Sequence, residues 1–104
     1  MESNLTQVDY FDSSALVKRY LSEMGSIFVQ KRCSDANRII VTSEISRVEV
    51  AAAFAAKRRG QLITQADYQK MTTQFKQDCQ QQYFLIPVDL QCIDEAVKLT
   101  GRQK

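Results

Sequence analysis

The sequence predicts an α/β domain with a short central parallel sheet covered by helices on both faces, a three-layer α/β/α arrangement. Three short apolar runs with strand-like composition alternate with segments whose apolar residues recur at helical spacing. The predicted order is strand, two helices, strand, two helices, strand, helix. Such alternation is typical of right-handed crossovers between parallel strands. No repeat and no Gly-, Ser- or Pro-rich linker divides the 104 residues, which favours a single domain.

The first half of the chain supplies two strands and two helices. A strand over residues 8–11 is followed by a helix that Ser13 and Ser14 can cap, and then by a second short helix over residues 28–36. Three contiguous apolar residues predict the next strand, over residues 38–41. A run of this kind is typical of a strand that is buried on both faces.

The second half contains the two longest predicted helices. The first covers residues 43–59, is rich in Ala and has a basic last turn, with Gly60 as the expected C′ residue that ends the helix. The second begins at the capping pattern of residues 64–67. A strand over residues 83–88 follows, and its proline cannot donate a hydrogen bond, so we expect it at a sheet edge. A final helix is expected over residues 93–100.

The composition excludes several kinds of chemistry. The chain contains no His, which rules out Ser-His-Asp and Cys-His catalysis and His-based zinc sites. A net charge of +2 is too small to argue for nucleic-acid binding by bulk electrostatics. The three Cys form no Cys-x-x-Cys motif, so we interpret them as reduced core thiols of a cytoplasmic protein. No apolar stretch approaches the ~20 residues of a membrane span.

Parallel sheets bind ligands outside the carboxyl ends of their strands, which directs attention to Asp12 and to the loop after Val41. Asp12 directly follows the first predicted strand and precedes a helix N-terminus. A carboxylate at this position can face the crevice and take part in catalysis. The alternative is a structural role, because Asp is a common turn and capping residue where a strand leads into a helix.

Glu49 is the second candidate. In a helix over residues 43–59 its neighbours one turn away are Ile45, Ala52 and Ala53, so we expect it on the apolar face. An unpaired carboxylate buried there costs several kcal/mol or takes up a proton, and a bound metal ion would remove that cost. The alternative is a later helix start, with Ser46 as N-cap and Glu49 as the third helical residue of a Ser-x-x-Glu capping box.

The other charged residues are weaker candidates. Asp9 lies three residues before Asp12, so strand alternation directs the two side chains to opposite faces and a shared site is not expected. Asp89 is expected to cap the final helix, with further acids in its first turn. The basic run at residues 57–59 can contact phosphates, but cations at that position also stabilise a helix C-terminus.

Two segments carry a more specific signal than any single residue. Residues 10–18 have the sequence YFDSSALVK, and residues 42–51 have the sequence TSEISRVEVA. The first resembles the opening of PIN-domain proteins of the VapC toxin type, where a hydrophobic strand ends in Asp-Thr/Ser-Ser-Ala-Leu. The second is similar to that family's second strand, which leads into a helix with an inward Glu. The order and spacing of the two segments also agree, and the resemblance covers the whole chain.

The resemblance implies a single PIN-like domain over residues 1–104 and a metal-dependent endoribonuclease that hydrolyses RNA phosphodiester bonds. Asp12 and Glu49 would then be catalytic residues that bind Mg²⁺ or Mn²⁺, and Ser14 would support the site through a hydrogen bond to Asp12 or to a metal-bound water. Hard oxygen ligands of this kind suit a chain without His. The implied partners are an RNA substrate and a cognate antitoxin protein, in the cytoplasm and with no membrane.

The chain departs from the family pattern at its C-terminus. In the family a further helix begins at a third acid and two more strands follow, and these lie beyond residue 104. We therefore expect a C-terminally truncated domain with impaired activity and an open edge on the first strand that favours a homo-oligomer. A non-enzymatic PIN-like module that binds partners is the alternative. A flavodoxin-like phosphate-binding domain is disfavoured, because no Gly-rich loop follows a strand.

Overall fold

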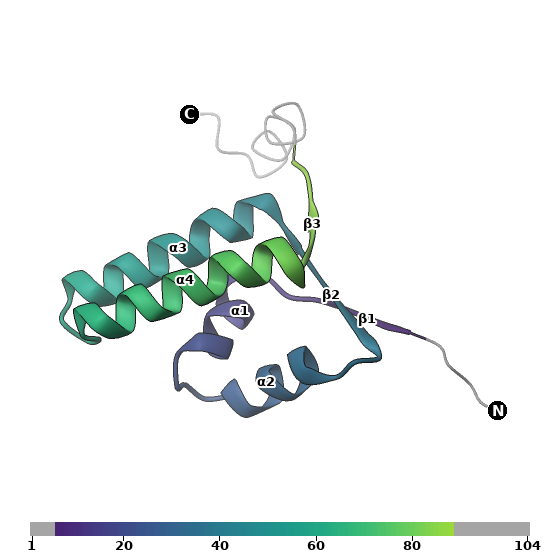
Figure 1. The fold of residues 1–104 in the computed structure, drawn as a ribbon, viewed down its shortest axis with the longest axis horizontal. Coiled ribbons are helices and arrows are strands. Elements are labelled where there is room, and N and C mark those ends of the chain that lie inside the picture. The colour runs from purple at the N-terminus through teal and green to yellow at the C-terminus, as the bar shows by residue number, and fades with distance from the viewer. Residues whose placement is uncertain (1–5, 89–104) are drawn as a thin grey trace, which may run out of the picture.

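The computed structural model describes residues 6–88, which form four helices and three strands (Figure 1). In chain order the elements are β1 (Gln7–Tyr10), α1 (Ser13–Tyr20), α2 (Ser26–Ser34), β2 (Arg38–Ser43), α3 (Glu44–Arg59), α4 (Gln65–Gln81) and β3 (Phe84–Ile86). This order confirms the predicted α/β alternation as far as the third strand. The predicted helix at residues 93–100 and its cap Asp89 lie outside the described residues.

The three strands form one parallel sheet in the order β1-β2-β3. Val8 pairs with Ile39 between β1 and β2, and Val41 pairs with Phe84 between β2 and β3. Among the strands of residues 6–88, β3 therefore lies at the edge of the sheet, in agreement with the prediction from Pro87, which cannot donate to a β-ladder. β2, which contains the contiguous apolar residues 39–41, occupies the centre of the three described strands.

Helices cover one face of this sheet within residues 6–88, and the prediction of helices on both faces is wrong for this part of the chain. On the covered face Ile40 and Thr42 are fully buried, whereas Val8 and Phe84 on the opposite face are 64% and 63% exposed. The steps from β1 to β2 and from β2 to β3 run in the same direction across the sheet. Right-handed connections then place both helix pairs on the same face.

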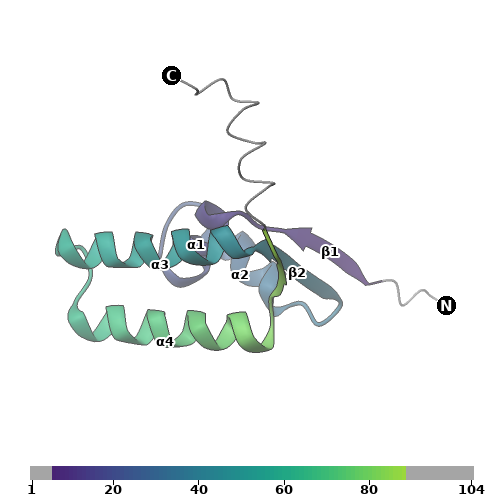
Figure 2. The ribbon, with the colours of Figure 1, turned by 90° about the horizontal axis from the view of Figure 1, so that it is seen from above.

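An aromatic cluster forms the centre of the helical layer. α3 and α4 lie side by side in both views (Figures 1 and 2), and α1 packs against α3. The rings of Tyr20, Phe54 and Phe75 meet edge to face, with centroids 5.6 to 5.9 Å apart. This arrangement is favourable for aromatic quadrupoles beyond the apolar area that it buries. One residue from each of three helices therefore fixes how α1, α3 and α4 pack.

A polar network lies beside these rings and joins α1 to the end of α4. Asp78 is buried and accepts hydrogen bonds from Tyr20 at 2.6 Å and Gln74 at 3.0 Å, and it pairs with Arg19 at 3.2 Å. Arg19 also donates to the hydroxyl of Tyr83 at 2.9 Å, and the hydroxyls of Tyr83 and Tyr20 are hydrogen-bonded. Because Tyr20 donates its proton to Asp78, Tyr83 donates to Tyr20. The buried charge of Asp78 is thus fully paired.

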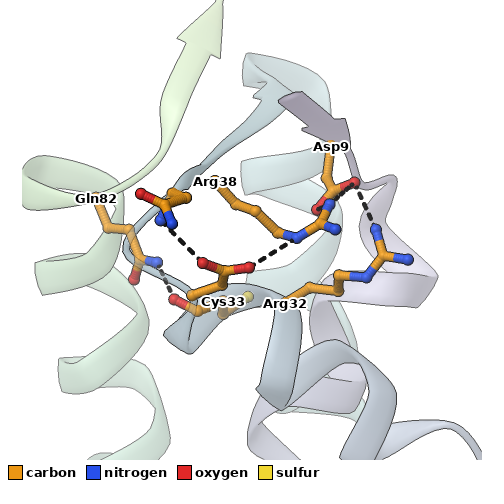
Figure 3. Close-up of polar contacts among 7 residues, drawn as sticks. Asp9, Arg32, Cys33, Arg38 and Gln82 are labelled. Carbon is orange, nitrogen blue, oxygen red and sulfur yellow. Dashed lines mark hydrogen bonds and ion pairs between the residues drawn. The ribbon is translucent and has the colours of Figure 1, made fainter. Parts of the chain in front are cut away.

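A second set of polar contacts fixes α2 against the sheet (Figure 3). Asp9 on β1 pairs with Arg32 of α2 at 2.9 Å and with Arg38 of β2 at 3.0 Å. The side chain of Gln82 donates to the carbonyl oxygen of Cys33 at 2.7 Å, which ties the end of α4 to α2. Asp9 is therefore engaged in ion pairs on the covered face, in agreement with the expectation that it does not share a site with Asp12.

The helix ends differ from prediction in two details. The side chain of Asp12 caps α1, instead of Ser13 or Ser14, and Ser43 and Thr64 cap α3 and α4. At the end of α3, Gly60 has φ of −78°, and the residue in the left-handed region is Gln61, with φ of 59°. The amides of Gln61 and Leu62 donate to the carbonyls of Arg58 and Lys57, so the chain turns one residue later than predicted.

Two expectations drawn from composition concern thiols and membranes. Cys33 and Cys79 are free and buried, as predicted for core thiols, and Cys92 lies outside the described residues. Within residues 6–88, the helices lack the combination of length and apolar character that a membrane crossing requires.

Because of the tyrosine network, the protein should lose stability at alkaline pH. Burial raises the pKa of Tyr83 to about 12, above its ordinary value of 10.0, and burial likewise raises the pKa of Tyr20. A folded-state pKa above the unfolded one gives stability that is complete below pH ~10 and is lost as the pH rises toward 12. We expect the free energy of unfolding to fall by roughly 2 kcal/mol for Tyr83 across this interval. Urea titrations from pH 8 to pH 12 measure this decline.

Two variants distinguish the effect of Tyr83 ionisation from other causes of unfolding at alkaline pH. Tyr83→Phe removes the titrating hydroxyl, so its stability should decline less between pH 10 and 12, although it is lower at pH 8. Tyr68→Phe, a matched change on α4 outside the network, should keep the wild-type pH dependence. Identical pH profiles for wild type and Tyr83→Phe would contradict the assignment.

Candidate functional site

The carboxyl ends of β1 and β2 lie next to each other, and each leads directly into a helix. The pairing extends beyond β1, because the amide of Phe11 donates to the carbonyl of Val41 at 2.9 Å. Asp12 follows at once as the N-cap of α1, and Ser43 at the end of β2 is the N-cap of α3. Two helices therefore begin at the carboxyl end of the sheet, which is where parallel sheets bind their ligands.

The carboxylate of Asp12 caps its helix through one oxygen atom. Oδ1 accepts hydrogen bonds from the Ala15 amide at 2.9 Å and from the Ser14 hydroxyl at 3.0 Å. These two donors hold the pKa of Asp12 below its usual range, so the exposed side chain is ionised at neutral pH. Within residues 6–88, Oδ2 receives no hydrogen bond. The capping role considered from the sequence is present, and it leaves one carboxylate oxygen available to a ligand.

Glu49 is exposed, so the expectation that it lies on the buried face of α3 is wrong. The buried positions of this helix are Ser46, Val50 and Phe54, one turn apart. Ile45, which was expected to share a buried face with Glu49, is itself 42% exposed. The capping-box alternative is also wrong, because Ser43 is the N-cap and its hydroxyl accepts from the amide of Ser46. No burial penalty therefore requires a cation at Glu49.

Glu49 and Ser14 nevertheless line the same surface hollow, which has a volume of about 310 Å³. Its lining comes from α1, from α3 and from the segment after α1: Ser13, Ser14, Val17, Lys18, Glu23, Glu49 and Ala53. Asp12 is not among the lining residues, but its carboxylate accepts a hydrogen bond from Ser14, which is one of them. The structure thus brings Glu49 and Ser14 to one hollow, and Asp12 is joined to this hollow only through its hydrogen bond with Ser14.

The charges around the hollow are mixed. Glu23 pairs with Lys57 at 3.6 Å, whereas Glu49 makes no ion pair within residues 6–88. Lys18 also lines the hollow, and its charge opposes cation binding there. Sequence reasoning did not single out Glu23, because it lies outside the predicted strands and in neither of the segments that resemble the family.

Asp12, Glu49 and Ser14 supply the hard oxygen donors that Mg²⁺ and Mn²⁺ prefer. The described part of the chain contains no group of three Asp, Glu, Cys or His residues placed to hold a metal ion. Two carboxylates and one hydroxyl fit a site that leaves most coordination positions to water or substrate oxygens. Such a site binds divalent ions weakly and without a rigid cage.

Comparison of the chain with protein-family models, with curated proteins and with solved structures found no match.

Replacement of Glu49 tests whether the hollow binds a cation. We expect Glu49→Gln to lower the affinity for Mn²⁺ about tenfold, because one of two carboxylates is lost, and to leave stability nearly unchanged, because the side chain is exposed. Calorimetric titration with Mn²⁺ and urea denaturation measure the two effects.

Asp67→Asn is the matched control, since it changes an exposed acid in the first turn of α4. Unchanged Mn²⁺ affinity in Glu49→Gln, or an equal loss in Asp67→Asn, would exclude the hollow as the cation site.

Proposed function

We propose that this chain is a PIN-like domain of the VapC toxin type whose activity is Mg²⁺- or Mn²⁺-dependent hydrolysis of RNA phosphodiester bonds. The observation that supports the proposal most directly is the common hollow. Glu49 from α3 and Ser14 from α1 line it, and Ser14 is hydrogen-bonded to Asp12. These are the three residues that the resemblance to the family assigns to the site.

The chain's own residues have separate tasks in this proposal. Asp12 and Glu49 hold the metal ion, and Ser14 orients the carboxylate of Asp12 by donating to Oδ1. A divalent ion bound there lowers the pKa of a water molecule and stabilises negative charge on the phosphate. The amide of Ala15 and the hydroxyl of Ser14 lower the pKa of Asp12, so this carboxylate is ionised at neutral pH. Lys18 in the same hollow is positioned to contact an RNA phosphate.

The other parts of the proposal follow the family resemblance. The proposed substrate is RNA in the cytoplasm, and the proposed regulator is a cognate antitoxin protein that occupies the hollow. The chain is proposed to form a homo-oligomer, and the unpaired outer edge of β1 within residues 6–88 supports that part.

Cleavage of RNA by the 104-residue chain tests the proposal. We expect slow cleavage that requires Mn²⁺ or Mg²⁺ and stops when the metal is chelated. Asp12→Asn should lower the rate at least tenfold, because the metal loses a charged ligand, while Asn retains the capping function at the start of α1. Gel analysis of a structured RNA measures the cleavage rate, and urea denaturation measures the free energy of unfolding. Together they separate the role of Asp12 as a metal ligand from its role as the N-cap of α1.

Two controls make the cleavage experiment specific. Asp67→Asn removes an equivalent acid on another helix and should retain full activity. Asp12→Ser also preserves an N-cap and should be as inactive as Asp12→Asn. Cleavage that persists in both Asp12 variants would come from a contaminating nuclease or another site, and would contradict the proposal.

A non-enzymatic module that binds partners through the same fold is the second candidate. It is favoured by the lack of a three-residue metal-binding group within residues 6–88. Complete absence of metal-dependent cleavage by correctly folded protein would favour this module over the nuclease.

A further inference from the structure

Three surface hollows lie next to one another around the first half of α3, and two of them have no role in the proposed function. Glu49 lines the hollow that contains Ser14, and it also lines a second hollow of about 360 Å³. Arg47 and Val48 line this second hollow and a third of about 380 Å³, which we call the α3–α4 hollow because residues of both helices line it. Through these shared residues the three hollows form one continuous groove from the candidate site to α4.

The positions of residues around α3 account for the order of the hollows. At 3.6 residues per turn, Glu49, Ile45 and Val48 follow one another around the helix, and Ala51 and Arg47 come next. Ile45 and Val48 are 42% and 66% exposed, so the strip between the candidate site and the α3–α4 hollow is apolar. A helix with its side chains is only ~10 Å across. A short polymer bound at Glu49 can therefore follow this strip to the other side of α3.

The α3–α4 hollow combines apolar walls with a positive rim. Val48 and Ala51 contribute apolar surface, and Arg47 and Lys76 contribute the charges. Among the described residues that line this hollow, none is acidic. Arg47 forms an exposed pair with Glu44 at 2.9 Å, and Lys76 forms no ion pair within residues 6–88. The hollow thus favours a ligand that carries both an apolar surface and negative charge.

An unpartnered hydroxyl borders the same hollow. Thr72 lines it, and the Oγ1 atom of Thr72 is buried with no hydrogen-bond partner within residues 6–88. An unsatisfied buried hydroxyl is unfavourable, so a ligand that forms a hydrogen bond with it gains affinity. Gln80 adds an amide group that can both donate and accept. Apolar surface, adaptable polar groups and cations at the rim are the features that bind an unpaired nucleobase and its flanking phosphates.

We propose that the α3–α4 hollow is a subsite for single-stranded RNA, in which an unpaired base lies against Val48 and Ala51 while Arg47 and Lys76 contact the adjacent phosphates. The proposal rests on the proposed function, because the strand reaches this hollow from the phosphate bound at Glu49. Duplex RNA is a poorer ligand, since its bases are stacked and paired. An acidic protein segment meets the same charges, but it does not account for the continuity of the groove with the candidate site.

RNA binding without metal tests the phosphate contact. Fluorescence anisotropy in EDTA measures the affinity for an unstructured, fluorescein-labelled RNA of about 12 nucleotides. We expect Lys76→Gln to weaken binding about fivefold and to lower the slope of log K against log salt by about one, as for the loss of one phosphate contact. Lys70→Gln makes the same charge change at an exposed position of α4 outside the hollow, and it should keep the wild-type affinity and slope.

Val48→Asp tests the contact with the base. Because Val48 is 66% exposed, the change should leave the fold intact, which circular dichroism checks. It should weaken RNA binding at least ~tenfold, since a charged group replaces the apolar wall and repels the phosphates. Leu62→Asp makes the same substitution of an acid for an apolar residue at a position that is 70% exposed, and it should bind RNA like the wild type. Wild-type affinity in both Lys76→Gln and Val48→Asp would overturn the proposal.

The metal-free assay distinguishes this proposal from the nuclease activity. Asp12→Asn should bind RNA in EDTA at least as tightly as the wild type, although it lowers cleavage. Weakened binding by the two hollow variants would support the subsite even if the protein cleaved no RNA. Metal-dependent cleavage combined with unchanged binding by those variants would overturn the subsite alone. Displacement of the RNA by polyglutamate as effectively as by unlabelled RNA would also overturn it, and would identify an acidic protein segment as the ligand.

Discussion

The handedness of the connections between parallel strands is the constraint on which the rest of the structure depends. Because β2 lies between β1 and β3, two successive right-handed crossovers place α1 to α4 on a single face of the sheet. The same order sets the carboxyl ends of β1 and β2 side by side, so that two helix N-termini begin at one edge. The position of the candidate site and the exposure of the opposite face of the sheet within residues 6–88 therefore both follow from one topological rule.

Buried polar groups in the helical layer stabilise this arrangement, because each of them needs a partner from another element. Asp78 carries a buried charge, and removal of Arg19 would leave it with only neutral donors, a loss that typically costs several kcal/mol. The network includes residues from α1 and α4 and Tyr83 just before β3, while Asp9 ties β1 to α2 and β2. Packing of the aromatic rings fixes the distances between helices. The polar contacts select one arrangement of those helices over others.

Local patterns predicted more of the fold than of the site. Strand-like runs and helical spacing predicted all seven described elements. The edge position of β3 among the described strands agrees with the prediction from Pro87, although β3 ends at Ile86, one residue before the proline. Glu49 was misplaced because α3 carries apolar residues on several sides, and Ile45 and Val48 are exposed although their type favours burial. The burial of Asp78 could not be predicted, since its partners Arg19 and Tyr20 lie 58 or more residues away. Which face of the sheet the helices cover depends on the order of the strands, and the periodicity of apolar residues does not reveal that order.

We propose that this topology brings Asp12 and Glu49, 37 residues apart in sequence, to one cation site. Paramagnetic broadening of amide resonances by bound Mn²⁺ measures this most directly. We expect substoichiometric Mn²⁺ to broaden the amides of residues 12–14 and of Glu49 together, and Asp12→Asn to weaken the effect at both segments equally. Broadening confined to one segment, or centred on Asp67 or another acid, would show that the two carboxylates do not share an ion.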